Sequence, residues 1–224
     1  MKIEEVEAVF DEFTSNPEEW DNTGILVNSY CESDKILLTI DLTEEVIDEA
    51  INFGIKLIVS YHPYIFKPLK SIVRKDYIKL IKNEISVYCP HTKLDFLMND
   101  YLFKKYNNYT FHELTSELKK KFNVSKLRGV FINNKTFSPM NDKLVVIVGS
   151  CYLPKVTNSF ILTGEMKHHD LLEAKRNNNS VILLDHSNSE RIFLPELKKI
   201  LKQKLPEDIK ILISKKDEDP IEMF

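Results

Sequence analysis

Glycine is scarce in this chain, with only 5 residues in 224. Dinucleotide fingerprints and phosphate-cradling P-loops need several glycines at close spacing, because their backbone N–H groups must approach phosphate oxygens. No segment has such a cluster, so both kinds of phosphate loop are excluded. If this chain binds a nucleotide, metal ions and basic side chains must hold the phosphates.

Arginine is scarce as well, since only four of the 31 basic residues are arginines. With 34 acidic residues, the formal net charge is −3. Surfaces dedicated to nucleic acid usually carry a basic excess and arginine forks directed at phosphate or guanine. The composition therefore argues against a nucleic-acid-binding protein.

Only three cysteines are present, Cys31, Cys89 and Cys151, and they form no CxxC pair. This odd, widely spaced set argues against a disulfide framework or a thiolate zinc site and fits a reducing compartment. The N-terminus shows no signal-peptide pattern, and no apolar run approaches the ~20 residues that span a bilayer. We expect a cytoplasmic or nuclear protein with no membrane partner.

What the sequence does contain is an alternation of strand and helix patterns, which predicts an α/β fold with mostly parallel or mixed sheets. The predicted strands are 35–40, 55–60, 85–89, 144–150, 159–165, 180–186 and 209–214. The predicted helices are 3–13, 44–53, 76–84, 168–176 and 193–201. Residues 101–141 lack clear periodicity and are interpreted as a transition. We therefore expect two related α/β halves, 1–105 and 106–224.

Histidines and carboxylates follow three of the predicted strands. These groups are Tyr61-His62-Pro63, His91 with Asp95, and His186 with Glu190. An i, i+4 spacing on a helical turn puts two side chains on one face, where they can converge on one ion. A mixed nitrogen and oxygen ligand set suits Zn²⁺, Mn²⁺, Fe²⁺, Co²⁺ or Ni²⁺. Taken singly, each group is equally well explained as a loop residue, a cap or a surface pair.

Two further segments each have two interpretations. In Thr163–His169, Glu165 is either a general base or a turn residue, and the neighbouring histidines His168 and His169 are either ligands or part of a first helical turn. The turn Trp20–Gly24 either lines a pocket or anchors a buried tryptophan. The sequence leaves these alternatives open.

Six segments in the same order resemble the NIF-three family, also known as the GTP cyclohydrolase I type 2 homologues. They are EEWDNTGILV, TIDLTEEVIDEAI, LIVSYHPYIFKPLKSI, CPHTKLD, LTGEMKHHD and ILLDHSNSER. The resemblance runs from Glu18 to the C-terminal DEDP at Asp217–Pro220 and is weakest near 101–142. It implies two interlocked α/β halves with a two-metal site in the cleft between them, commonly in a toroidal homohexamer. The chain resembles the short form, without the inserted central domain of long members.

The resemblance also implies roles for single residues. It assigns His62, Asp95, His186 and Glu190 as metal ligands and places His91 close to the metals. Tyr61 stands where many bacterial members have a first histidine. A phenol ligates only when a strong Lewis acid helps to remove its proton. We therefore expect one or two divalent ions, with one site built on His62, Asp95 and Glu190 retained and the second position weakened.

Two functions from different classes follow from the resemblance. The first is a metal-dependent hydrolase that acts on GTP or a related nucleotide through metal-bound water. Glu190 and Asp95 would hold the ions, and His91 or Glu165 would shuttle protons. The alternative is a non-catalytic metal-binding protein that associates with transcriptional regulators. GTP turnover that is lost in Glu190→Ala would favour the enzyme, whereas partner capture that survives this substitution would favour the interaction protein.

Overall fold

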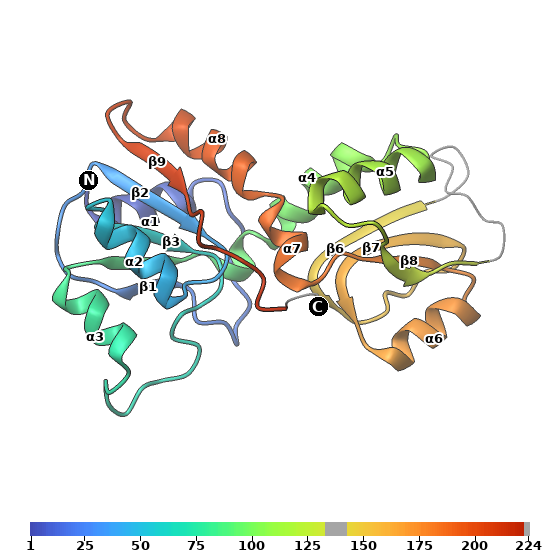
Figure 1. The fold of residues 1–224 in the computed structure, drawn as a ribbon, viewed down its shortest axis with the longest axis horizontal. Coiled ribbons are helices and arrows are strands. Elements are labelled where there is room, and N and C mark those ends of the chain that lie inside the picture. The colour runs from blue at the N-terminus through green and yellow to red at the C-terminus, as the bar shows by residue number, and fades with distance from the viewer. Residues whose placement is uncertain (133–142, 222–224) are drawn as a thin grey trace. The chain divides into compact units, whose positions relative to one another are not determined.

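The chain folds into two units in the computed structural model, which describes residues 1–132 and 143–221 (Figure 1). Unit 1 comprises Met1–Phe96 and Leu194–Phe224, and unit 2 comprises Leu97–Phe193. The expected halves were 1–105 and 106–224. The C-terminal segment joins unit 1 because its strand β9 (Lys210–Ile213) pairs in parallel with β2 (Lys35–Thr39), a long-range pairing that local patterns do not reveal.

Unit 1 is built on a five-stranded sheet in the order β1-β4-β3-β2-β9. Strands β2, β3 (Leu57–Ser60), β4 (Ser86–Cys89) and β9 are parallel, and β1 (Gly24–Val27) pairs antiparallel with β4 at the edge. Every residue of β3 and β4 is buried, as expected for strands covered on both faces. The parallel order brings the carboxyl ends of β2, β3 and β4 to one edge of this sheet.

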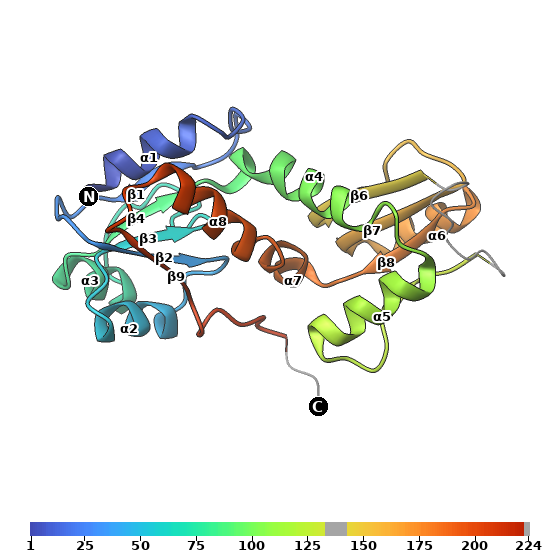
Figure 2. The ribbon, with the colours of Figure 1, turned by 90° about the horizontal axis from the view of Figure 1, so that it is seen from above.

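Helices cover both faces of the unit 1 sheet (Figure 2). On one face lie α2 (Glu44–Asn52) and α3 (Lys75–Lys82), which pack with Leu37, Ile58 and Val87 of the strands. On the other lie α1 (Ile3–Asp11) and α8 (Leu194–Lys204). Strand β4 shows the alternation, since Val87 belongs to the α2 and α3 side while the ring of its neighbour Tyr88 lies 4.9 Å from that of Phe10 in α1.

Unit 2 is built on a four-stranded sheet in the order β5-β8-β7-β6. Strands β6 (Lys143–Cys151), β7 (Ser159–Met166) and β8 (Ser180–Leu183) are parallel, and β5 (Arg128–Val130) is an antiparallel edge. Helix α6 (His168–Arg176) packs through Ala174 on one face, and α4 (Asp95–Tyr106) and α5 (Phe111–Phe122) lie over the other. The short helix α7 (His186–Arg191) follows β8.

The segment 101–141, interpreted from its sequence as a transition between the halves, has regular structure in its described part. Residues 101–132 contain the end of α4, all of α5 and the strand β5. Helix α5 begins with a capping box, in which the Thr110 hydroxyl accepts from the backbone N–H of Glu113 and the Glu113 carboxylate accepts from that of Thr110. Residues 133–142 of this segment lie outside the described ranges.

In residues 1–132 and 143–221, no helix is both long enough and apolar enough to cross a membrane.

Candidate metal centre

In unit 1, three neighbouring parallel strands deliver polar side chains to the same edge of the sheet. Asp41 follows β2, Tyr61 and His62 follow β3, and His91 follows β4. The ring centroids of His62 and His91 lie 5.7 Å apart, and the Tyr61 ring lies 5.0 Å from the first and 5.4 Å from the second. The structure therefore brings these predicted residues together, where an open α/β sheet usually has its ligand site.

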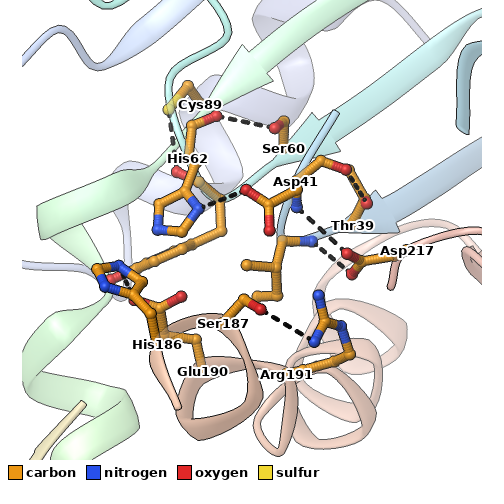
Figure 3. A network of polar contacts seen from close by, with 12 residues as sticks. Thr39, Asp41, Ser60, His62, Cys89, His186, Ser187, Glu190, Arg191 and Asp217 are labelled. Atoms are coloured by element: carbon orange, nitrogen blue, oxygen red, sulfur yellow. Dashed lines mark hydrogen bonds and ion pairs between the residues drawn. The ribbon is translucent and has the colours of Figure 1, made fainter. Parts of the chain in front are cut away.

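The His62 imidazole is oriented by the Asp41 carboxylate (Figure 3). His62 Nδ1 lies 2.9 Å from Asp41 Oδ1, and the two side chains are 23% and 31% exposed. Because a carboxylate only accepts hydrogen bonds, Nδ1 carries the proton in this pair. Nε2 is then the unprotonated nitrogen that can ligate a metal.

His91 has the same kind of partner in Asp21, a residue of the turn at Trp20–Gly24. His91 Nδ1 lies 2.7 Å from Asp21 Oδ1, and the Thr92 hydroxyl donates to Asp21 Oδ2 at 2.6 Å. Burial raises the pKa of Asp21, but the hydrogen bonds from Thr92 and His91 outweigh it and hold the pKa below its usual value. Trp20 is 63% exposed, so the interpretation of this turn as the anchor of a buried tryptophan is wrong.

Asp95 is the first residue of α4 and accepts a hydrogen bond from the Tyr61 phenol, with 2.5 Å between Oη and Oδ1. His91 and Asp95 do not form a pair on one helical turn, as their spacing suggested. His91 opens a 3-10 turn, His91–Lys93, and has a positive φ of 33°. The two side chains have separate partners, and the Tyr61 ring contacts the His91 ring while its hydroxyl contacts Asp95.

In unit 2, the i, i+4 spacing of His186 and Glu190 has the predicted result. Both lie on α7, and His186 Nε2 is 3.3 Å from Glu190 Oε1. On its other side, His186 Nδ1 is 2.6 Å from Glu165 Oε1 at the end of β7. Glu165 thus lies against a histidine, in the same relation as Asp41 to His62.

Two of the scarce glycines make room for this helix. Gly149 has a φ of +64°, and a Cβ there would lie 2.7 Å from Glu190 Oε1 and 3.4 Å from His186 Nε2. A Cβ at Gly164 would lie 2.7 Å from the Ser189 hydroxyl. That hydroxyl accepts from the Gly149 N–H at 2.8 Å, so the close approach of β6, β7 and α7 depends on glycine.

His168 and His169 do not join either cluster. Both are exposed residues in the first turn of α6, with ring centroids 5.6 Å apart. This arrangement agrees with the interpretation of these histidines as part of a first helical turn.

Sequence reasoning missed three carboxylates that support these clusters. Asp41 and Asp21 contact the histidines directly, and the buried Asp217 contacts the backbone at Asp41. A local signal existed for Asp41, which comes directly after the predicted strand 35–40, in the position where parallel strands present ligand-site residues. Asp217 had no such signal, because its contact joins positions far apart in the sequence.

Each unit pairs an imidazole with a carboxylate that could ligate a metal. Unit 1 has His62 beside Asp41, and unit 2 has His186 beside the buried Glu190. Imidazole nitrogens with a buried carboxylate fit a divalent ion such as zinc, manganese or iron.

A pocket of about 680 Å³ opens beside His62 within unit 1. Asp41, Thr43, Tyr64, Arg74 and Lys216 are among the side chains that line it. Arg74 and Lys216 contribute positive charge, Asp41, Glu45 and Glu218 contribute negative charge, and Tyr64 contributes an aromatic ring. The pocket thus combines a candidate ligand histidine with charged groups of both signs.

Comparison with known proteins identifies relatives over the whole chain. The family model Duf34/NIF3 (NGG1p interacting factor 3) matches residues 1–220. NIF3-like protein 1 of Drosophila melanogaster is 36% identical and covers 93% of this chain and 84% of that protein. The GTP cyclohydrolase 1 type 2 homolog of Campylobacter jejuni is 31% identical over the full length of both chains.

The solved structures agree on the architecture. A Bacillus cereus protein related to NIF3 superposes with a TM-score of 0.80 over 100% of this chain and 99% of that one, at 16% identity. This likeness confirms the predicted α/β fold. The family match over residues 1–220 shows that the chain belongs to the Duf34/NIF3 family, as its motifs indicated.

Proposed function

We propose that this chain binds a divalent metal ion through His62, Asp95, His186 and Glu190. One observation, made for both His62 and His186, carries the proposal. In each of them a carboxylate lies within hydrogen-bond distance of Nδ1, the arrangement in which ligand histidines usually bind their metal through Nε2. In unit 2, Glu190 Oε1 already lies beside that nitrogen.

The function that we infer for the loaded site is hydrolysis of GTP or a related nucleotide. A divalent ion lowers the pKa of a coordinated water molecule toward ~7, which supplies a nucleophile at neutral pH. His91 is the proton carrier in this proposal, because Asp21 holds its Nδ1 and its ring lies beside that of His62. The name of the Campylobacter jejuni relative, GTP cyclohydrolase 1 type 2 homolog, supports GTP as the substrate class.

The pocket in unit 1 supports a nucleotide as ligand. Its volume of about 680 Å³ lies in the usual range for small-molecule sites, ~300–1,000 Å³. Lys216 lines this pocket and can contact phosphate oxygens, whereas Arg74 also lines it but already pairs with Asp76. Because metal ions are needed to hold the remaining phosphate charge, metal-free protein is expected to bind GTP poorly.

Metal content and GTP turnover test this proposal together. Protein purified without chelator is expected to hold one ion per chain, measured by plasma mass spectrometry, and to consume GTP in a chromatographic assay. Glu190→Gln should lose both properties, while Glu196→Gln, which alters a surface carboxylate paired with Lys199, should keep both. Equal metal content in the two variants would refute the assignment of Glu190.

One observation favours a second function. In this function the protein binds metal without catalysis and associates with transcriptional regulators. The Tyr61 phenol donates to Asp95 Oδ1, so one carboxylate oxygen of a proposed ligand is engaged by a protein group. The family description, NGG1p interacting factor 3, agrees with an interaction role. Metal-loaded protein that binds GTP without consuming it would favour this function over hydrolysis.

A further inference from the structure

The C-terminal motif Asp217–Pro220 contains a buried carboxylate with no part in the proposed chemistry. Asp217 is only 7% exposed, although Lys216 and Glu218 on either side of it are exposed. The segment continues from β9, where the Ser214 N–H donates to the Leu38 carbonyl of β2 at 2.9 Å. This pairing carries the chain along β2 to its carboxyl end.

At that end, Asp217 accepts hydrogen bonds from two successive backbone groups (Figure 3). The Ile40 N–H donates to Oδ2 at 2.8 Å, and the Asp41 N–H donates to Oδ1 at 3.4 Å. A charged acceptor strengthens such bonds, and burial excludes the water that would compete for the N–H groups. Asp217 therefore fixes the backbone where β2 ends.

The same two residues lead directly to His62. Asp41 Oδ1 lies 2.9 Å from His62 Nδ1, and the Ile40 carbonyl accepts from the His62 N–H at 3.0 Å. The Thr39 hydroxyl donates to the Asp41 carbonyl at 2.7 Å and holds the turn from a third side. The position of the Asp41 carboxylate thus depends on the backbone that Asp217 holds.

We propose that Asp217 is a positioning residue for His62. By holding Ile40 and Asp41, it places the Asp41 carboxylate on His62 Nδ1 and so selects the tautomer with unprotonated Nε2. The inference rests on the proposed function, since His62 is a metal ligand only there. Outer partners of ligand histidines typically change metal affinity ~10- to 100-fold when removed.

The test compares Asp217→Asn with Glu218→Gln in the full chain. Both substitutions remove one negative charge from neighbouring positions, and the hydrogen bonds to the Ile40 and Asp41 N–H groups come from Asp217. The His62 tautomer is measured by ¹⁵N NMR on metal-free protein at pH 8.5, and Zn²⁺ affinity by competition with a chromogenic chelator. In Asp217→Asn we expect a mixture of His62 tautomers and ~10- to 100-fold weaker Zn²⁺ binding, with Glu218→Gln like the wild type.

The proposal is overturned if Asp217→Asn keeps the wild-type tautomer, or if Glu218→Gln shifts it equally. If Asp217→Asn fails to fold, Asp41→Ala replaces it in the test. This substitution changes a partly exposed side chain that links the Asp217 contact to His62. An unchanged His62 tautomer in Asp41→Ala would overturn the proposal as well. Wild-type protein that binds no Zn²⁺ would refute the proposed function, while the tautomer measurement on metal-free protein still decides the role of Asp217.

Discussion

Each unit holds a histidine beside a carboxylate, but the groups that fix this pair differ between the two units. In unit 1, Asp41 is 31% exposed and its backbone is held by the buried Asp217. In unit 2, the corresponding carboxylate of Glu165 is 54% exposed, but Glu190, the proposed ligand beside His186, is only 3% exposed. In unit 1 the histidine is therefore fixed by its carboxylate partner. In unit 2 it is fixed by the packing of α7.

Because of this difference, the histidines of the two units should be sensitive to different kinds of substitution. Unit 1 depends on a sequence of hydrogen bonds that starts at Asp217 and ends at His62. Unit 2 depends on space, because Gly149 and Gly164 allow β6 and β7 to approach α7. Polar substitutions should affect the first unit most, and substitutions that add volume should affect the second.

The largest expected effect is that of Gly149→Ala. Alanine at a φ of +64° is strained by ~1 kcal/mol, and its Cβ would also collide with Glu190 Oε1. We expect metal affinity to fall by at least about 100-fold, the upper end of what loss of a supporting group causes. Chelator competition measures the affinity, and thermal melting measures the stability.

The matched control for this prediction is Gly54→Ala. Gly54 has a φ of +62°, but its Cβ would meet only the Lys35 Nζ at 4.0 Å. Both variants should lose similar stability from the backbone, and only Gly149→Ala should lose metal affinity. Equal metal affinity in the two variants would contradict the claim that the site in unit 2 needs the space beside Gly149.

The next largest effects compare Asp41→Ala with Glu165→Ala. Each removes the carboxylate from one histidine Nδ1, and Asp41→Ala should weaken metal binding about 10- to 100-fold. Glu165→Ala should cost about tenfold or less, because its more exposed carboxylate interacts through water of high dielectric constant. A larger loss in Glu165→Ala than in Asp41→Ala would reverse the comparison.

The Tyr61 variants should change metal count more than affinity. In Tyr61→Phe, Asp95 loses the phenol donor and one ion per chain should still be held. Tyr61→His introduces an imidazole nitrogen beside Asp95, so its metal content after dialysis is expected to rise toward two ions. Wild-type protein that already holds two ions tightly would contradict the prediction of a weakened second position.

The smallest effect concerns acid stability in unit 1. The pKa of Asp21 is lowered in the folded state, so its stabilising contribution is present above the unfolded value of ~3.9 and is lost as pH falls through the folded value. Urea unfolding from pH 6 to pH 3 should therefore show a shallower loss of stability in Asp21→Asn than in the wild type. Glu196→Gln serves as the surface control and should keep the wild-type slope.

Much of the fold was readable from local patterns, and the exceptions have physical causes. The helix at 168–176 and the pair at His186 and Glu190 were predicted because a strand end passes directly into a helix there. The edge strand β1 was missed, since all four of its residues are only partly buried and show no alternation. His91 and Asp95 were assigned to one helical turn, but a 3-10 turn with its own hydrogen bonds separates them.

The supporting residues of the site were the hardest to predict. Asp41 and Asp21 are acids in turns, a context in which caps and solvent-exposed residues are common. Their role depends on which histidine the fold brings to them, and for Asp217 this requires the pairing of β9 with β2. The sequence shows locally which ligand residues follow a strand. The groups that orient those ligands are brought to them by tertiary structure and cannot be predicted from local patterns.

The place of β9 has a further consequence for how the protein is made. Strand β2, which lies between β3 and β9, pairs with β9 only after all of Leu97–Phe193 has been synthesised, since β9 comes later in the chain. Unit 2 is continuous and can fold during translation, whereas the unit 1 sheet must wait with one side of β2 unpaired. A ribosome stalled shortly before β9 should therefore carry a folded second unit and an incomplete first one.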